Sequence, residues 1–421
     1  MTMFDLAAVL ISVAAALAYL NFRTLRIPAT IAMLLAGLTG AVGISIVDRI
    51  LPLIGLSARV AHLLDNVNFS ALLMNGMLGY LLFAGSLTVD YQELKKSLTG
   101  VMTLATVGVL LSTAIVGIGS FYLFGFAGAG VPFLFCLVFG ALISPTDPVA
   151  VVALMHDLKV PKRLEVNFTG ESLLNDGVGV VVFTVLLAIA TAGAVSAPMV
   201  VGLFAREVIG GVVLGAVGGW IVHLASESID EPNIEVLLSV ALVTALGSAA
   251  AHLHVSGPLA CVVAGIFIGN KARNQAMRSD TTEALDRIWS FADLVMNAIL
   301  FLLLGLQGAV FGFSSSRHAE VIGAIVALVI IARLVSVAIP LTVIRRFQSM
   351  PKGMIRMLTW GGLRGGISVA LALSLPRFEG RQAVLDATYA VVVFTIIVQG
   401  LTIGRLIRHF TTENRRADVA S

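Results

Sequence analysis

The chain has 421 residues, of which 58% are hydrophobic and 12% are charged. Ordinary soluble domains carry about 25% charged residues, so the composition excludes such a domain and predicts an all-α polytopic membrane protein surrounded by lipid. The net charge of +3 is too small to indicate nucleic acid as a partner.

Thirteen apolar segments follow one another along the chain, and several exceed the ~20 residues that a membrane-spanning helix needs. The tenth is the least regular, because Asp286, Arg287 and Asp293 make its first half amphipathic. The segments lie at residues 4–21, 27–47, 69–88, 98–124, 131–155, 164–192, 199–225, 233–252, 257–271, 285–312, 320–345, 355–375 and 383–407.

The basic residues are concentrated in alternate connections between these segments. Lys95 and Lys96 follow the third segment, for example, whereas the connections at 126–130 and 191–197 hold neither Lys nor Arg. The positive-inside rule therefore predicts an N-terminus outside the cell and a C-terminus in the cytoplasm. The connection at 226–233 is acidic although this topology makes it cytoplasmic, but acidic residues carry little weight in the rule.

Thirteen spans divide into six, one and six. A single linking helix would invert the second half relative to the first, as an inverted repeat requires. We therefore predict a first six-helix repeat, a linking helix, a second six-helix repeat and a short cytoplasmic tail. Their ranges are 1–192, 193–232, 233–410 and 411–421.

Two segments are interrupted by helix-breaking residues. Ser-Pro-Thr-Asp-Pro at 144–148 and Gly-Gly-Leu-Arg-Gly-Gly at 361–366 each interrupt the fifth segment of their own repeat. Discontinuous helices at corresponding positions are typical of a transporter site. We expect the two broken helices to cross, and where they cross their half-helix ends leave partial charges that need partners. Asp147 could neutralise the positive ends and Arg364 the negative ones. The alternative is that these residues only kink the helices, which a charge at each break disfavours.

The sixth segment carries polar residues in the middle of apolar sequence. Gly-Glu-Ser-Leu-Leu-Asn-Asp-Gly at 170–177 runs directly into an apolar stretch, although an acid at the centre of a membrane helix costs roughly 2.5–3.5 kcal/mol. Ser172 and Asp176 are four residues apart and share a helix face, where their oxygens could bind a hard cation. Glu171 and Asn175 form the neighbouring pair and could support that site.

Arg333 is a further charge inside an apolar segment and needs a counter-ion. We expect this counter-ion to be Glu171, with Asp147 as the next candidate, which leaves Asp176 as the free acid. Alternatively, Arg333 extends to the cytoplasmic surface near Arg345. About twelve residues, or ~18 Å of helix, separate the two arginines, which is too far for easy access.

These motifs resemble those of the NhaP-type sodium/proton antiporters. This group belongs to the asparagine–aspartate branch of the monovalent cation/proton antiporter family, which also contains the animal sodium/proton exchangers. The motifs at 144–148, 170–177 and 361–366 occur in the family's order, and the resemblance covers nearly the whole chain. It implies an ion- and proton-binding role for one acid, Asp176, with Asn175 beside it.

The resemblance also implies roles for the residues around this acid. Thr146 and Asp147 match the pair that helps to line the Na⁺ site, to which Ser172 adds a hydroxyl group. Glu171 and Arg333 match a supporting ion pair behind the site. Arg364 matches the arginine of the second broken helix.

The resemblance further implies a homodimer of thirteen-helix subunits that exchanges Na⁺ or Li⁺ for H⁺ one for one, without a cofactor and without enzymatic activity. Because one carboxylate cannot hold a proton and an ion at once, competition would produce exchange by alternating access and a steep dependence on pH. Only a short segment follows the last span, unlike the long regulatory tail of the animal exchangers. This fits a prokaryotic inner-membrane protein that serves pH homeostasis.

Other functions stay open at this point. The same scaffold could serve a potassium/proton antiporter. A cation channel would also place polar groups at mid-span, although it would not need inverted broken helices. An intramembrane hydrolase could use Ser172, or Asp147 and Asp176 as a dyad, but this leaves Arg364 without a role. Transport assays with Na⁺, Li⁺ and K⁺ separately would distinguish these functions.

Overall fold

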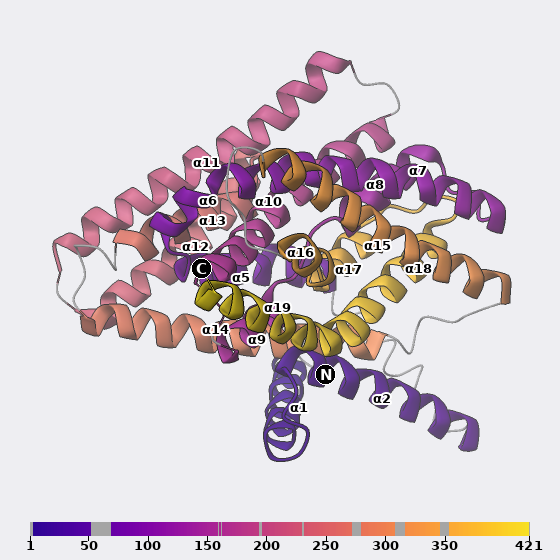
Figure 1. Ribbon diagram of the computed structural model, residues 1–421, viewed down its shortest axis with the longest axis horizontal. Helices are drawn as coiled ribbons and strands as arrows, with labels where there is room; N and C mark the ends of the chain where they lie inside the picture. Colours follow the sequence, from indigo (N-terminus) through magenta and orange to yellow (C-terminus); the bar gives the residue numbers. More distant parts are fainter. Residues whose placement is uncertain are drawn as a thin grey trace.

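Figure 1 shows the computed structural model of the chain. It describes residues 3–51, 69–158, 160, 162–192, 196–229, 231–271, 279–307, 316–345 and 353–420. Every element of regular structure within these ranges is a helix. The all-α prediction is therefore confirmed.

The first half of the chain leads from two N-terminal helices to the long helix α10. Its third and fourth apolar segments each contain a π-helical turn, labelled η1 and η2. The elements are α1 (Met3–Arg23), α2 (Ala29–Ile50), α4 (Phe69–Ala71), η1 (Leu72–Met77), α5 (Leu78–Leu87), α6 (Tyr91–Thr103), η2 (Leu104–Gly108), α7 (Val109–Ala127), α8 (Phe133–Ile143), α9 (Val149–Asp157) and α10 (Lys162–Ala192).

The second half begins with α11, which is as long as α10, and ends with a helix that reaches Ala420. A third π-helical turn, η4, joins α18 to α19. The elements are α11 (Ala197–Glu227), α12 (Pro232–Leu253), α13 (Gly257–Lys271), α14 (Ser279–Gln307), α15 (Ser316–Ile344), α16 (Met354–Trp360), α17 (Gly366–Leu373), α18 (Arg381–Phe394), η4 (Thr395–Gln399) and α19 (Gly400–Ala420).

The helices account for the predicted membrane spans. In the described part of the chain, eight helices are long and apolar enough to cross a membrane, and four shorter apolar helices accompany them. With the broken pair α16–α17, they correspond to the thirteen predicted segments. The chain is thus a multi-pass membrane protein. Residues 411–420, predicted as a separate tail, continue α19, and residues 308–312 of the tenth segment lie outside the described ranges.

Helix α10 lies at the centre of the molecule, whereas α11 lies at its edge. In the most apolar stretch of α10, 61% of the residues are buried, compared with 28% in α11. Figure 1 shows α11 along one border, with α1 and α2 at the opposite one. Because α10 faces protein rather than lipid, it can carry polar side chains at mid-span.

Small residues set the close approach of several helices. Helix α14 packs against α2, where a Cβ atom on Gly37 would lie 2.8 Å from the Cα atom of Gly305 and 2.6 Å from the carbonyl oxygen of Leu302. Backbone atoms cannot move aside as a flexible side chain can, so this contact requires glycine. It holds α14, which lines the cavity described below, against the N-terminal helices.

Candidate functional site

The breaks in the two discontinuous helices meet inside the protein. One lies between α8 and α9 and the other between α16 and α17. The backbone N–H of Asp147 donates a hydrogen bond to the carbonyl oxygen of Leu363, at 2.8 Å. On the second break, the backbone N–H of Arg364 donates to Thr395 Oγ1 at 3.1 Å. The predicted crossing of broken helices is therefore present, and backbone groups freed by the breaks find partners in it.

A charged side chain lies at each of two helix ends. The Arg364 guanidinium group donates to the carbonyl oxygens of Ser144 and Pro145, the latter at 3.0 Å, just beyond the C-terminal end of α8. The Asp147 carboxylate accepts a hydrogen bond of 3.0 Å from the N–H of Val149, the first residue of α9. Because a helix is negative at its C-terminus and positive at its N-terminus, each charge has the sign that neutralises the end beside it.

The glycines of the second break make room for these charged groups. A Cβ atom on Gly362 would lie 2.6 Å from Arg333 Nε, and one on Gly365 would lie 2.7 Å from the Cβ of Asp147. Arg333 is buried and Asp147 is partly buried, and both are hydrogen-bonded, so neither can move at little cost. The break therefore brings backbone within contact distance of side chains from two other elements.

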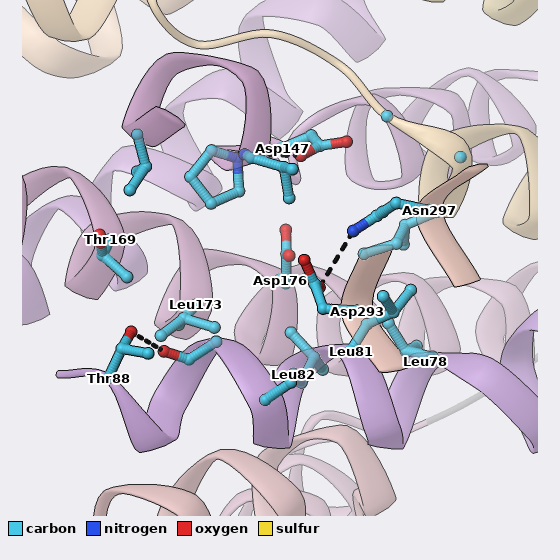
Figure 2. A pocket seen from close by; sticks show the side chains of 18 of the residues that line it. Leu78, Leu81, Leu82, Thr88, Asp147, Thr169, Leu173, Asp176, Asp293 and Asn297 are labelled. Carbon is cyan, nitrogen blue, oxygen red and sulfur yellow. Dashed lines mark hydrogen bonds between the residues drawn. The ribbon is translucent and has the colours of Figure 1, made fainter. Parts of the chain in front are cut away.

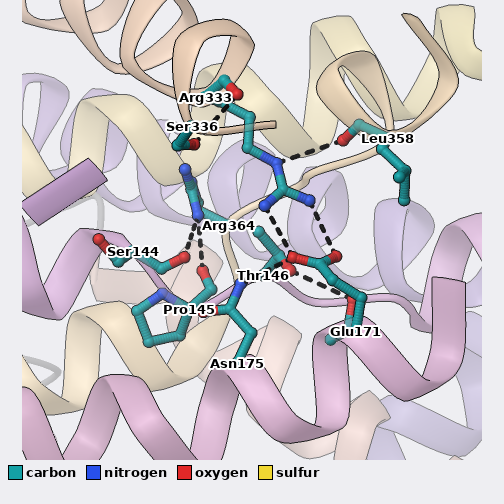
Figure 3. Close-up of polar contacts among 10 residues, drawn as sticks. Ser144, Pro145, Thr146, Glu171, Asn175, Arg333, Ser336, Leu358 and Arg364 are labelled. Carbon is teal, nitrogen blue, oxygen red and sulfur yellow. Dashed lines mark hydrogen bonds and ion pairs between the residues drawn. The ribbon is translucent and has the colours of Figure 1, made fainter. Parts of the chain in front are cut away.

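Glu171 on α10 and Arg333 on α15 form the predicted ion pair (Figure 3). Arg333 Nη1 and Nη2 donate to the two carboxylate oxygens of Glu171 at 2.8 and 2.9 Å, and Arg333 Nε donates to the carbonyl oxygen of Leu358 at 3.2 Å. Glu171 is 0% exposed and Arg333 is 7% exposed. Arg333 thus has an internal counter-ion, as predicted, instead of extending to the cytoplasmic surface.

Asn175 connects this ion pair to the first broken helix (Figure 3). Its Nδ2 donates to Glu171 Oε1 at 3.2 Å and to Thr146 Oγ1 at 3.3 Å. The Thr146 hydroxyl is in turn 3.2 Å from that of Ser172. These contacts fix the orientation of the amide, whose Oδ1 has no hydrogen-bond partner among the described residues.

Asp176 lines a cavity of about 310 Å³, and Figure 2 shows it between Asp147 and Asp293. Its side chain is 4% exposed, and its Oδ1 has no hydrogen-bond partner among the described residues. The backbone N–H of Thr146 provides a hydrogen bond to the carboxylate. A buried carboxylate oxygen without a protein partner is costly to maintain, so Oδ1 of Asp176 has the capacity to bind a ligand in the cavity.

The cavity divides the residues predicted for the site into two groups. Thr146, Asp147 and Asp176 line it. Ser172, predicted as an ion ligand, is 2% exposed, contacts Thr146 and does not line the cavity. The predicted supporting residues also lie outside the lining; these are Glu171, Asn175, Arg333 and Arg364.

The prediction missed Asp293 and Asn297, two polar residues of α14 that line the same cavity (Figure 2). Asn297 Nδ2 donates to Asp293 Oδ1 at 3.0 Å. The available signal was the amphipathic first half of the tenth segment, which indicated a polar helix face but not what that face meets.

Comparison with known proteins identifies the group to which this fold and site belong. The family described as "Sodium/hydrogen exchanger, transmembrane" matches residues 11–409. The chain belongs to this sodium/hydrogen exchanger family. The matched region, residues 11–409, includes both helix breaks and all of α10. The site residues described above therefore lie within the region that defines the family.

Two curated exchangers illustrate the relationship. The chain is 42% identical over 416 residues to the Na⁺/H⁺ antiporter NhaP of Pseudomonas aeruginosa, with 96% of each chain covered. It is 32% identical to the Na⁺/H⁺ antiporter NhaH of Halobacillus dabanensis, covering 92% of this chain and 93% of that one. The similarity extends over nearly the full length of both relatives.

The fold is also similar to that of a solved archaeal structure. The sodium proton antiporter MjNhaP1 of Methanocaldococcus jannaschii at pH 8 superimposes with a TM-score of 0.73, covering 97% of this chain and 98% of that chain. Only 16% of the residues are identical, so this match concerns the fold of the exchanger and not the identity of its ligand.

Proposed function

We propose that this protein exchanges Na⁺ or Li⁺ for H⁺ across the prokaryotic inner membrane, one ion for one proton, by alternating access. The observation that carries the proposal is the buried Asp176 carboxylate, which lines the cavity and has one oxygen without a hydrogen-bond partner among the described residues. The names of the full-length relatives, which are Na⁺/H⁺ antiporters, support the choice of ions.

Competition for Asp176 would couple the two ions. A proton on the carboxyl group removes the charge that attracts a cation, and a bound cation removes the need for a proton. Thr146 and Asp147 line the same cavity and add hydroxyl and carboxylate oxygens, which are the ligands that hard cations prefer. Either a proton or a cation neutralises the site. A neutral, loaded site would change its access from one side of the membrane to the other more readily than an empty, charged site.

The buried charges support a one-for-one exchange. Arg333 offsets Glu171 within a direct ion pair. Arg364 offsets a second carboxylate beside the helix break, so Asp147 and Asp176 together keep one net negative charge. Asp286 and Asp293 also line the cavity, but they belong to α14 and are not counted with this pair. A single monovalent cation or a single proton is sufficient to cancel that charge, and each direction of the cycle would then carry the same net charge.

The cavity would open to the cytoplasm if the positive-inside topology holds. Its outer lining includes Thr88 at the end of α5 and Asp286 near the start of α14. Thr88 precedes the basic pair Lys95 and Lys96, and Asp286 follows the basic connection at 272–278. In this orientation the N-terminus is outside, the C-terminus is cytoplasmic, and Asp176 is accessible from the inside.

The assembly and the repeat organisation are parts of the same proposal. We assign repeats at 1–192 and 233–410 with a linking helix at 193–232, and a homodimer as the working form. Helix α11 lies in the linking range and exposes apolar side chains such as Ile209, at 62%, and Ile221, at 57%. This exposure supports a linking helix at the periphery of the protein. This surface can face lipid or a second copy.

Transport by purified protein in lipid vesicles tests the proposal. With an imposed pH gradient, external Na⁺ or Li⁺ should drive proton movement by the native chain, and Asp176→Asn should reduce the rate to that of empty vesicles because the amide cannot exchange a proton. Asp280→Asn, which changes an exposed acid at the start of α14, should keep the native rate. Proton movement driven by K⁺ alone would favour a potassium/proton antiporter, and Na⁺-driven exchange by Asp176→Asn would refute the assignment.

A further inference from the structure

A second hollow lies on the outside of the protein, away from the ion cavity. It is a groove of about 440 Å³ between α15, α16 and α19, and it shares no lining residue with that cavity. We call it the α16 groove. Its lining consists of Leu334, Arg356, Thr359, Trp360, Thr402, Arg405 and Leu406.

Two exposed arginines from different helices line the α16 groove. Arg356 belongs to α16 and Arg405 to α19, and no hydrogen bond or ion pair links either of them to another residue in the described part of the chain. Two guanidinium groups around one hollow repel each other unless an anion lies between them. Guanidinium donors match phosphate oxygens in geometry and charge.

The floor of the groove carries a polar group that also lacks a partner. Thr359 is 8% exposed, and its Oγ1 is buried without a hydrogen bond among the described residues. Beside it, the Trp360 ring is fixed by a hydrogen bond of 2.8 Å from Nε1 to Thr402 Oγ1. The groove therefore combines two cationic donors, one buried hydroxyl and a rigid aromatic wall.

The surroundings of the groove are apolar and exposed. Leu334 on α15 is 45% exposed, Leu401 on α19 is 46% exposed, and Val398 just before α19 is 38% exposed. In a membrane protein such side chains contact acyl chains. A free anion would gain nothing from this surface, whereas a lipid could place its phosphate between the arginines and its chains against the leucines. Tryptophan is also enriched at the level of the lipid headgroups.

We propose that the α16 groove binds the phosphate headgroup of an anionic phospholipid. Basic pockets between transmembrane helices on the cytoplasmic side are a known setting for such headgroups. A bound lipid would contact α16, whose Leu358 carbonyl oxygen accepts the hydrogen bond from Arg333. Occupancy would thus stabilise the half-helix that precedes the second break. The proposal does not depend on which ion the protein transports.

Native mass spectrometry of the full-length protein in detergent can test this site by titration with phosphatidylglycerol, phosphatidylcholine or inorganic phosphate. Phosphatidylglycerol should be retained and should raise the melting temperature, whereas the other two should do neither. Equal retention of phosphatidylcholine would overturn the headgroup assignment. Stabilisation by inorganic phosphate equal to that by the lipid would show an anion site without lipid character and would also overturn the proposal.

Charge-matched variants locate the binding. A juxtamembrane arginine contributes about 1 kcal/mol to binding of anionic lipid, or about fivefold, so Arg356→Gln with Arg405→Gln should raise the half-saturating phosphatidylglycerol concentration roughly thirtyfold. The control pair, Arg23→Gln with Arg26→Gln, removes two exposed arginines elsewhere and should leave it unchanged.

Two more variants preserve either the charge or the shape of the groove, so a change in lipid binding cannot be attributed to misfolding. Lysine at both groove positions retains the charges, so it should preserve most of the binding. Thr359→Val keeps the shape of the floor but removes its hydroxyl, and it should weaken binding severalfold. If the glutamine pair and its control bind phosphatidylglycerol equally well, the α16 groove is not the site.

Discussion

Asp293 is the residue whose environment differs most from what its sequence position indicates. Its carboxyl group lines the ion cavity together with Asp147 and Asp176, and Asn297 holds it by a hydrogen bond of 3.0 Å. It contributes a negative charge along the path to Asp176, but no hydrogen bond links it to that residue. We therefore assign it to ion attraction and not to ion binding itself.

Asp293→Asn should weaken the apparent affinity for Na⁺ with little effect on the maximal rate. A unit charge a few ångströms from a hydrated path contributes about 1 kcal/mol, so the half-saturating Na⁺ concentration should rise about fivefold. Initial rates over a range of Na⁺ concentrations give both quantities. Ser290→Ala, which alters another cavity residue of α14, is the control. A complete loss of transport would instead make Asp293 part of the binding site.

The residues near the breaks could be predicted from sequence because charges in apolar segments are rare and need partners. This argument led to Glu171 for Arg333, and the two are in contact. It could not place Asp293, since a polar face on one helix does not reveal which helix it meets. Nor could it show that the Ser172 hydroxyl group contacts Thr146, because a shared helix face with Asp176 does not determine which neighbouring element covers that group.

Among the elements, the central connection is the one that joins α10, α15 and α16. Arg333 of α15 is bound both to Glu171 of α10 and to the backbone of Leu358 in α16. All of these donors and acceptors are buried, so removing one partner leaves a charge without compensation. The second broken helix therefore depends on this ion pair for its position.

Glu171→Gln and Arg333→Met should each lower the free energy of unfolding by about 3–5 kcal/mol, the usual cost of an unpaired buried charge. The double variant should recover part of this loss, since it leaves neither charge alone. Thermal unfolding of all four proteins measures the coupling. As a control, Glu283→Gln breaks an exposed pair with Arg287 and should change stability by no more than about 1 kcal/mol. Strictly additive losses in the buried pair would mean that the two side chains act separately.

The breaks themselves were predictable from proline and glycine, which interrupt helices by removing backbone donors or by permitting extended backbone. That the two broken helices cross was expected from their corresponding positions in the two predicted repeats. The bond from Asp147 N–H to the Leu363 carbonyl oxygen and the close approach of Gly362 to Arg333 could not be predicted. They depend on how α8 and α16 pack, which is a property of three-dimensional contacts and not of either segment.

At the scale of the whole molecule, the balance of buried charges determines how transport responds to voltage. In the proposed mechanism the site keeps one net negative charge and binds one monovalent ion or one proton, so its two loaded forms carry the same charge. Exchange in vesicles clamped with K⁺ and valinomycin should therefore proceed at the same rate at positive, zero and negative potentials. Vesicles without protein give the background, and a consistent acceleration at one polarity would require a second ion or a second carboxylate in the cycle.

Proton release on ion binding tests the competition at Asp176 most directly. Purified protein in weakly buffered detergent solution is mixed with Na⁺ while a pH-sensitive dye records the protons that appear. Near the pH at which half of the sites are protonated, saturating Na⁺ should release about half a proton per subunit from the native chain, approaching one at lower pH, and none from Asp176→Asn. Choline chloride at equal ionic strength should release none. Binding of Na⁺ without proton release by the native chain, or equal release by Asp176→Asn, would contradict the assignment of one shared carboxylate.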